Sequence, residues 1–379
     1  MNIALQTLPS AAVECATLLV AMELSKKRWL IGFQGPTGKL KRRSVAGGEV
    51  AALLRLIAEE RARLEKKLCS PIKVVSCYEA GYDGFWLDRL LRAHGIENYV
   101  IDPSSIAVDR RARSAKTDTI DLDKQARSLL AHLGGDKSVL RLVRVPSAEE
   151  EDARRLSRER KRLVSEKTQH LGRIDGLLMT QGVRGFSPAK PGWEERLAKL
   201  KTGDGRPLPP RLKAEIARQI ERLALVIGMI KEIEAEEARL IAADETSIAA
   251  RLFKLRSIGL IAATGMADEL YCRDFRNRRQ VGGYLGLDDC RWQSGNSDRG
   301  QGISKAGNPR ARALIIELAW LWLRWQPQSA LSRWFVALVG NARGRVRRVA
   351  IVALARKLAV ALWRYVTTGV VPEGALLKA

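Results

Sequence analysis

The stretch Thr17-Leu18-Leu19-Val20-Ala21-Met22, followed by Glu23, decides how this chain folds. A second stretch, Ile72-Lys73-Val74-Val75-Ser76-Cys77-Tyr78, runs in the same way into Glu79. Both stretches are short and apolar and favour extended backbone, so they predict two buried β-strands. An acidic side chain at the end of a buried strand is costly to desolvate unless a cation meets it. Glu23 and Glu79 are therefore the first candidate site residues.

Strand and helix patterns alternate around these stretches, from residue 17 to about residue 145. The further predicted strands are Arg28–Phe33 and Asn98–Ile101, and the predicted helices are Glu49–Leu68, Phe85–His94 and Thr117–Leu133. A Gly-Pro pair at Gly35-Pro36 predicts a turn. Strands combined with crossing helices indicate an α/β sheet domain, which we expect over residues 1–145.

A second pair of acids lies in Lys116-Thr117-Asp118-Thr119-Ile120-Asp121. Asp118 and Asp121 are three residues apart, so they share one face of a helix. Taken singly, each acid is more often an ordinary strand-end or surface carboxylate than a ligand. Two strand-end acids and a helical pair can nevertheless converge to hold a hard cation through oxygen, as Mg2+ (or Mn2+) requires. The joint pattern therefore favours a metal site.

The composition favours a polyanionic partner. The 379 residues are enough for two or three domains, and 66 Lys and Arg against 42 Asp and Glu give a formal net charge of +24. Such an excess suits nucleic acid, because each phosphate that is neutralised releases counterions.

Membrane and secretory signals are missing from the sequence pattern. No apolar run approaches the roughly 20 residues of a bilayer span, and the first 20 residues lack the basic segment of a signal peptide. The five cysteines form no CxxC pair and fit reduced thiols. These patterns predict a cytoplasmic protein.

A different pattern begins at Pro146 and the acidic run Glu149–Asp152. Apolar residues then recur near a heptad seam from Leu156 to Leu177 and again from Ile216 to Leu240, while the Gly- and Pro-rich stretch 182–210 predicts a loop. Two long helices joined by a loop predict an antiparallel coiled-coil arm over residues 146–249. A simple packed helical hairpin is the equally weighted alternative.

The last region, residues 250–379, predicts a mainly helical and basic domain. Its polar, Gly-rich stretch from Asp288 to Gly307 predicts a loop around Ser294-Gly295. Asn308 is expected to cap the following helix, with Pro309 in the first turn. The basic side chains of this stretch and of the next helix are Arg291, Arg299, Lys305, Arg310 and Arg312.

Taken together, these motifs resemble those of the insertion-sequence 110 family of transposases, with its 1111 subgroup. Members are called DEDD transposases and are understood as RNA-guided serine recombinases. The family's Lys-Thr-Asp-x-Ile-Asp motif is present in full at residues 116–121, and its acid-small-Gly-aromatic motif appears as Glu79-Ala80-Gly81-Tyr82. In the first motif, Glu23 stands where the family has Asp.

The family's serine motif also appears in this chain. Its parts are Gly286-Leu287, Ser294-Gly295 and Ile303-Ser304-Lys305-Ala306-Gly307-Asn308. The resemblance covers roughly residues 17–133 and 250–325, and the region between them matches in character more than in motif.

The resemblance implies a fold and a site. It implies a ribonuclease H-like (Holliday-resolvase-like) N-terminal domain, a coiled-coil arm and a mainly helical C-terminal transposase domain. The acidic residues Glu23, Glu79, Asp118 and Asp121 would hold Mg2+ or Mn2+, and Ser294 would be the nucleophile. Lys116, Arg291, Arg299, Lys305, Arg310 and Arg312 would contact nucleic acid.

The resemblance also implies an activity and partners. The protein would be a transposase that cuts and rejoins DNA through a serine–DNA phosphoester, acting on element ends and target, with a structured noncoding RNA as guide. Domains of different subunits would build one composite site, which implies a homo-oligomer: a dimer, and a tetramer in the synaptic complex. Its place would be the bacterial cytoplasm, at the nucleoid.

Two other interpretations stay open. A metal-dependent, structure-selective DNA nuclease would use the acids to direct water, with Ser294 as an ordinary turn serine. A noncatalytic nucleic-acid-binding relic would explain Glu23 as a decayed site, because glutamate places its charge about one methylene further out and Mg2+ tolerates little displacement. Tyr78 and Tyr82 could also offer a hydroxyl nucleophile, although we expect both to pack beside the sheet.

Overall fold

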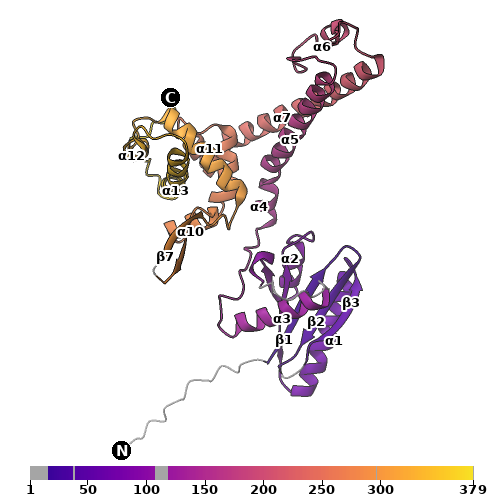
Figure 1. Ribbon diagram of the computed structural model, residues 1–379. Helices are drawn as coiled ribbons and strands as arrows, with labels where there is room; N and C mark the ends of the chain where they lie inside the picture. Colours follow the sequence, from indigo (N-terminus) through magenta and orange to yellow (C-terminus); the bar gives the residue numbers. More distant parts are fainter. Residues whose placement is uncertain (1–15, 37–38, 107–117, 296, 379) are drawn as a thin grey trace, which may run out of the picture. The chain divides into compact units, whose positions relative to one another are not determined.

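The computed structural model describes residues 16–36, 39–106, 118–295 and 297–378 (Figure 1). The chain divides into two compact units, Met1–Ser147 and Ala148–Ala379, here called the N-terminal unit and the C-terminal unit. Within the described ranges, no helix is both long and apolar enough to cross a membrane.

The N-terminal unit is built on a five-stranded mixed sheet with the order β3-β2-β1-β4-β5. The strands are β1 (Ala16–Leu24), β2 (Arg28–Gln34), β3 (Lys41–Ala46), β4 (Ile72–Glu79) and β5 (Glu97–Ile101). β1 pairs antiparallel with β2 and parallel with β4, and β4 pairs parallel with β5. This α/β arrangement, with the two expected strands β1 and β4 at its centre, is consistent with a ribonuclease H-like fold.

Helices cover both faces of this sheet. They are α1 (Val50–Leu68), α2 (Trp86–Ala93) and α3 (Asp118–Leu133), and a short 3-10 turn, η1, spans Pro103–Ser105. Successive strand residues point to opposite faces. Leu18 and Val20 of β1 therefore pack with α1 and α2, whereas Leu19 and Ala21 pack with α3. By the same alternation, Glu23 lies on the α3 face.

Strand β3 is an element that the sequence pattern did not predict. It reads Lys41-Arg42-Arg43-Ser44-Val45-Ala46 and is mostly exposed. It pairs on one side only, with β2. Charged side chains are typical of such an edge because they discourage pairing with other chains. Because β3 is mostly polar and exposed, it lacks the alternation of apolar and polar residues that predicts a half-buried strand.

The C-terminal unit begins with the short helix α4 (Ala148–Ala153). Two long antiparallel helices follow, α5 (Arg155–Met179) and α7 (Pro210–Ala243). Two side-chain contacts show the relative direction of α5 and α7. Arg160 Nη2 lies 2.6 Å from Glu234 Oε1, and His170 Nδ1 lies 2.8 Å from Gln219 Oε1. As the residue number rises on α5 it falls on α7, so the helices run antiparallel (Figure 1). The coiled-coil geometry stays a prediction.

The expected loop at 182–210 contains a helix, α6 (Trp193–Lys199), which the sequence analysis missed. Leu197 of α6 is buried with Ile174 of α5 and Ile216 of α7. The many Gly and Pro residues that flank α6 hid a segment of only seven residues. Tertiary burial, rather than local preference, stabilises so short a helix.

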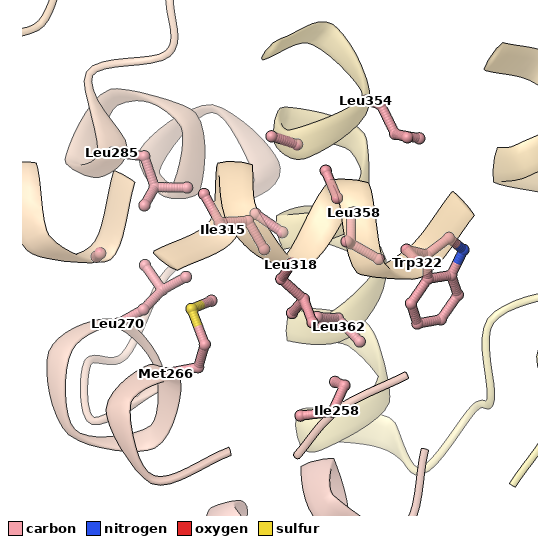
Figure 2. Packing of buried hydrophobic residues seen from close by; sticks show 14 of the residues in the cluster. Ile258, Met266, Leu270, Leu285, Ile315, Leu318, Trp322, Leu354, Leu358 and Leu362 are labelled. Carbon is pink, nitrogen blue, oxygen red and sulfur yellow. The ribbon is translucent and has the colours of Figure 1, made fainter. Parts of the chain in front are cut away.

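The rest of the C-terminal unit is a helical body with its own core (Figure 2). Its elements are α8 (Ile248–Phe253), α9 (Leu260–Met266), the π-helix η2 (Ala267–Tyr271), α10 (Arg278–Leu285), β6 (Asp289–Ser294), β7 (Ser297–Ile303), α11 (Pro309–Trp325), α12 (Ala330–Val339) and α13 (Arg345–Thr368). Ile315, Leu318 and Trp322 of α11 pack against Leu358 and Leu362 of α13.

A buried carboxyl group lies where α7 meets this body. Glu237 of α7 is 3% exposed, and its Oε2 has no hydrogen-bond partner among the described residues. Burial raises the pKa of Glu237 to about 7. A carboxyl group with a raised pKa binds its proton more tightly in the folded state than in the unfolded state. The contribution of Glu237 to the free energy of unfolding therefore falls as pH rises from about 4.5 to about 7, and it is constant above pH 7.

We therefore expect Glu237→Gln to stabilise the protein at pH 8 by at most about 3 kcal/mol and to have little effect at pH 5. Thermal unfolding of the full chain at both pH values measures this. Glu236→Gln is the matched control, because Glu236 is the exposed neighbour on the same helix. An equal response of the two variants at pH 8 would contradict the role of burial.

Candidate metal and nucleophile sites

The carboxylates of Glu23 and Glu79 lie side by side on the α3 face of the sheet. β1 and β4 are parallel neighbours with Met22 opposite Tyr78, so the next residues, Glu23 and Glu79, stand at the same level. Both side chains are half-buried. The amide of Gln125 on α3 donates from its Nε2 to Glu23 Oε2 at 2.7 Å and to Glu79 Oε1 at 3.2 Å. One side chain of α3 thus joins the two strand-end acids.

The first turn of α3 carries the other two acids. Asp118, Asp121 and Gln125 lie at helical spacing and share one face of α3. Acids in a first turn interact favourably with the helix dipole. Asp118 also meets Arg28 Nη2 at 3.6 Å, but both side chains are well exposed, so this ion pair contributes little.

The acids share one electrostatic field. Burial raises the pKa of Glu23 to about 7, and the charges of Glu79, Asp121 and Asp118 add to this rise, while the hydrogen bond from Gln125 opposes it. The predicted acids are thus close enough to repel one another. A cation among them would relieve that repulsion and the cost of burial together.

The donor chemistry fits a hard divalent cation, since carboxylate oxygens are the ligands that Mg2+ and Mn2+ prefer. The spacing is wider than a coordination shell: in the described part of the chain, no three His, Cys, Asp or Glu side chains form a group that could hold a metal. A cavity of about 130 Å³ lies beside the pair and is lined by Glu23, Leu24, Glu79, Ala80, Gly81, Tyr82 and Asp83. A cation would therefore have to draw the acids together.

Gln125 is a site residue that the sequence analysis missed. It is fully buried, between Leu122 and Leu129 on the apolar face of α3, and its Oε1 has no partner in the described residues. A polar residue where the helical pattern calls for an apolar one is the signal that could have found it. Its amide nitrogen donates a hydrogen bond to each of the two strand acids.

The two tyrosines near Glu79 differ from each other. Tyr78 is buried, as expected, and its hydroxyl donates to Gly84 O at 3.0 Å. Burial raises its pKa further above the ordinary range, so its hydroxyl is a poor nucleophile. Tyr82 does not pack beside the sheet, because its side chain is 99% exposed, with Lys26 Nζ 5.7 Å from its ring centre.

Ser294 lies at the end of an exposed β-hairpin, not in the loop that the Gly-rich sequence predicts. β6 and β7 pair antiparallel, and Ser294 is opposite Ser297 at the turn. Gly295 follows in the left-handed region, with φ of 55°, as a tight turn requires. Most side chains of both strands are polar, so hydrophobic alternation is weak here, and the β6–β7 pairing defines the hairpin.

The base of this hairpin is fixed to the helical body. Asp288 Oδ1 accepts from Arg356 Nη2 of α13 at 2.9 Å, and Asp288 O accepts from Ser304 N at 2.9 Å. Gly307 has φ of 140°, and a Cβ there would come within 2.4 Å of Tyr284 O. The backbone can pass at this point only without a side chain. The hairpin therefore presents Ser294 from a fixed base.

Several basic residues that were expected to contact nucleic acid are engaged within the protein. Arg291 pairs with Asp289 at 3.2 Å and with Asp298 at 3.6 Å. Arg312 Nη1 donates to the carbonyl groups of Leu285 at 2.9 Å and Lys305 at 3.1 Å. These contacts fasten the hairpin region, and a role in nucleic-acid binding stays a prediction for both.

The remaining basic candidates differ in their surroundings. Arg310 lies 3.5 Å from the buried Glu269. Lys305 is exposed and has φ of 55°, and Arg299 is exposed opposite Trp292. Lys116 lies outside the described residues. Asn308 caps α11 as expected, with its Oδ1 accepting from Arg310 N at 2.9 Å.

The comparisons with known proteins decide the family. Residues 20–181, which include the four acids, match the transposase family DEDD_Tnp_IS110. Residues 249–333, which include Ser294, match the family described as Transposase IS116/IS110/IS902. The chain is 45% identical to "Putative transposase y4rJ" of Sinorhizobium fredii, over 97% of this chain and 96% of the relative.

The chain belongs to the IS110/IS116/IS902 family of transposases. It is also 29% identical to the transposase for insertion sequence element IS1111A of Coxiella burnetii, over 74% of each chain. This confirms the predicted resemblance. An insertion-sequence transposase is a DNA-cutting enzyme, so the partner that the net charge of +24 predicts is DNA. The DEDD domain suggests dependence on a divalent metal cation.

Proposed function

We propose that this transposase cuts and rejoins DNA through a phosphoester on Ser294, with Mg2+ or Mn2+ held by Glu23, Glu79, Asp118 and Asp121. The observation that carries the proposal is the placement of Glu23 and Glu79 side by side on the α3 face of the sheet, where both contact Gln125 and where Asp121 adds to the electrostatic field at Glu23. The ribonuclease H-like fold of this domain belongs to the same proposal. The cation, when bound, would polarise the phosphate and neutralise charge on it.

The reaction proposed for Ser294 keeps the number of phosphoester bonds constant. Its Oγ attacks a DNA phosphorus and gives up its proton, while the bond from that phosphorus to one deoxyribose oxygen breaks and this oxygen takes a proton. A deoxyribose hydroxyl of another strand then attacks the phosphoserine and releases Ser294. One phosphoester is made for each one broken, so rejoining needs no ATP. The exposed hairpin end supports this role, because DNA can reach the hydroxyl there.

The site proposed here draws on both parts of the chain. The four acids belong to the N-terminal unit and Ser294 to the C-terminal unit. We infer a composite site assembled in a homo-oligomer, a dimer that forms a tetramer in the synaptic complex. The division into a domain at 1–145, a coiled-coil arm at 146–249 and a transposase domain at 250–379 is part of this proposal.

A structured noncoding RNA is the proposed guide. The support is the family resemblance together with the large basic excess, which suits two nucleic acids bound at once. Base pairing would carry sequence specificity while the protein contacts backbone and shape, as in other RNA-guided systems.

The test uses the full chain, element-end and target DNA, RNA transcribed from the flank of the element, and Mg2+ or Mn2+. We expect recombinant DNA only when that RNA is present, and a new target preference when its pairing segment is changed. A scrambled RNA of equal length is the control. Hydrolytic nicks without joined products would instead support the structure-selective nuclease, and binding without either product would support the noncatalytic relic.

A further inference from the structure

A basic groove lies on the C-terminal unit between α10, α12 and α13. Its volume is about 510 Å³, and it is lined by Arg278, Arg279, Leu331, Arg356, Lys357, Val360, Ala361 and Arg364. Five of these eight residues are Arg or Lys, and none is acidic. Cationic side chains that are grouped without acids repel one another, and an anionic ligand would remove that repulsion.

The spacing along α13 produces one wall of this groove. Arg356, Val360 and Arg364 are four residues apart, with Lys357 and Ala361 next to them, so they form one stripe along the helix. The start of α10 supplies Arg278 and Arg279 from the other side. A row of cations on a helix, facing two more, suits a ligand with repeated negative charges.

Most of these cations are available for a ligand. Within the described residues, Arg278, Arg279, Lys357 and Arg364 are exposed and take part in no ion pair, unlike Arg291 and Arg310. Lys357 Nζ lies 4.7 Å from the ring centre of Trp334 on α12, which holds the ammonium group at the groove.

The groove is connected to the base of the serine hairpin. Arg356, which lines it, pairs with Asp288 at 2.9 Å, directly before β6. A Cβ on Gly282 of α10 would come within 2.8 Å of Arg356 Nε, so glycine leaves room for this guanidinium. A polyanion in the groove would therefore lie next to the residue that fixes the hairpin.

We propose that this groove binds the phosphodiester backbone of DNA, next to the base of the hairpin that carries Ser294. DNA is the committed ligand because the family acts on DNA. The groove offers guanidinium and ammonium groups that bind phosphate oxygens, so we expect it to add affinity for a duplex of any sequence. The inference rests on DNA cutting by the family and not on the serine mechanism.

The test compares two triple variants of the full chain. The groove variant is Arg279→Gln, Lys357→Gln and Arg364→Gln. The control variant is Arg218→Gln, Arg222→Gln and Lys231→Gln, which removes the same charge from exposed positions on α7. Thermal unfolding checks that both variants fold.

Binding of duplex DNA is measured by fluorescence anisotropy from 50 to 300 mM salt. We expect the groove variant to bind about 10- to 100-fold more weakly at 100 mM salt, on every duplex sequence tried, with a salt slope shallower by about 2 to 3. The control variant should lose at most a few fold. Restoring charge with Arg279→Lys, Lys357→Arg and Arg364→Lys, in place of the Gln changes, should recover most of the affinity.

Three results would overturn the proposal. They are wild-type DNA affinity in the groove variant, an equal loss in the control variant, and loss of RNA binding with DNA binding intact. The measurement reads binding alone, so failure of the serine mechanism leaves it unaffected.

Discussion

Ser294→Ala should abolish both recombinant products and any covalent protein–DNA adduct, while the variant still binds DNA and RNA like the wild type. Ser294 is exposed at the end of a hairpin whose base is tied to α13 through Asp288 and Arg356. Loss of one exposed hydroxyl therefore leaves the fold intact. Without the hydroxyl no phosphoserine forms, and the bond energy needed for rejoining is lost.

The measurement is a trapped reaction on nicked DNA, followed by digestion and mass spectrometry. The wild type should give a peptide that spans Trp292 to Arg299 with a nucleotide on Ser294. Ser297→Ala is the matched control, because Ser297 is the cross-strand partner of Ser294 at the same turn, and it should keep the adduct. An adduct on the exposed Tyr82 would move the nucleophile, and full recombination by Ser294→Ala would end the serine mechanism.

The centre of the sheet could be predicted because its signals are local. The apolar runs before Glu23 and Glu79 became β1 and β4, and their parallel pairing sets both acids at one level. The helical spacing of Asp118 and Asp121 placed them on one face of α3, as expected. These features follow from periods of 2 and 3.6 residues, which the sequence displays directly.

Other elements depend on tertiary contacts that the local sequence pattern does not reveal. β3 and the β6–β7 hairpin carry mostly polar side chains, so their hydrophobic alternation is weak and their pairing defines them as strands. The short α6 exists because Leu197 is buried between α5 and α7. Local pattern is weak wherever tertiary contacts decide the structure.

The candidate sites show the same limit. Glu23 and Glu79 lie at the ends of β1 and β4, as the apolar runs predict, but Gln125 was missed because its contacts with both acids arise only when α3 packs on the sheet. Arg291 pairs with Asp289 on its own strand and with Asp298 on the facing strand, and the second of these contacts exists only because β6 pairs with β7. Such pairings are chosen by the fold rather than by spacing alone.

Glu79→Gln and Asp121→Asn should each lower strand cutting by about 10³-fold or more, because a bound cation contributes several kcal/mol of charge stabilisation. Asp118→Ala and Asp121→Ala should behave alike. Each change removes a negative charge from a group of acids that repel one another, so the melting temperature should be unchanged or higher. Weaker binding of Mn2+ by isothermal titration, measured without DNA, provides a readout that is separate from activity.

The matched control for these variants is Asp123→Asn. Asp123 lies on the same helix, but its carboxylate accepts hydrogen bonds from Arg42 at 2.6 and 2.7 Å, away from the acids. It should keep cutting activity and Mn2+ binding. Glu23→Asp should keep or raise activity, since it restores the shorter acid of the family; a complete loss would show that the site has adapted to the longer side chain. Unchanged cutting by Asp121→Asn would contradict the metal site, because its charge then does nothing for the reaction.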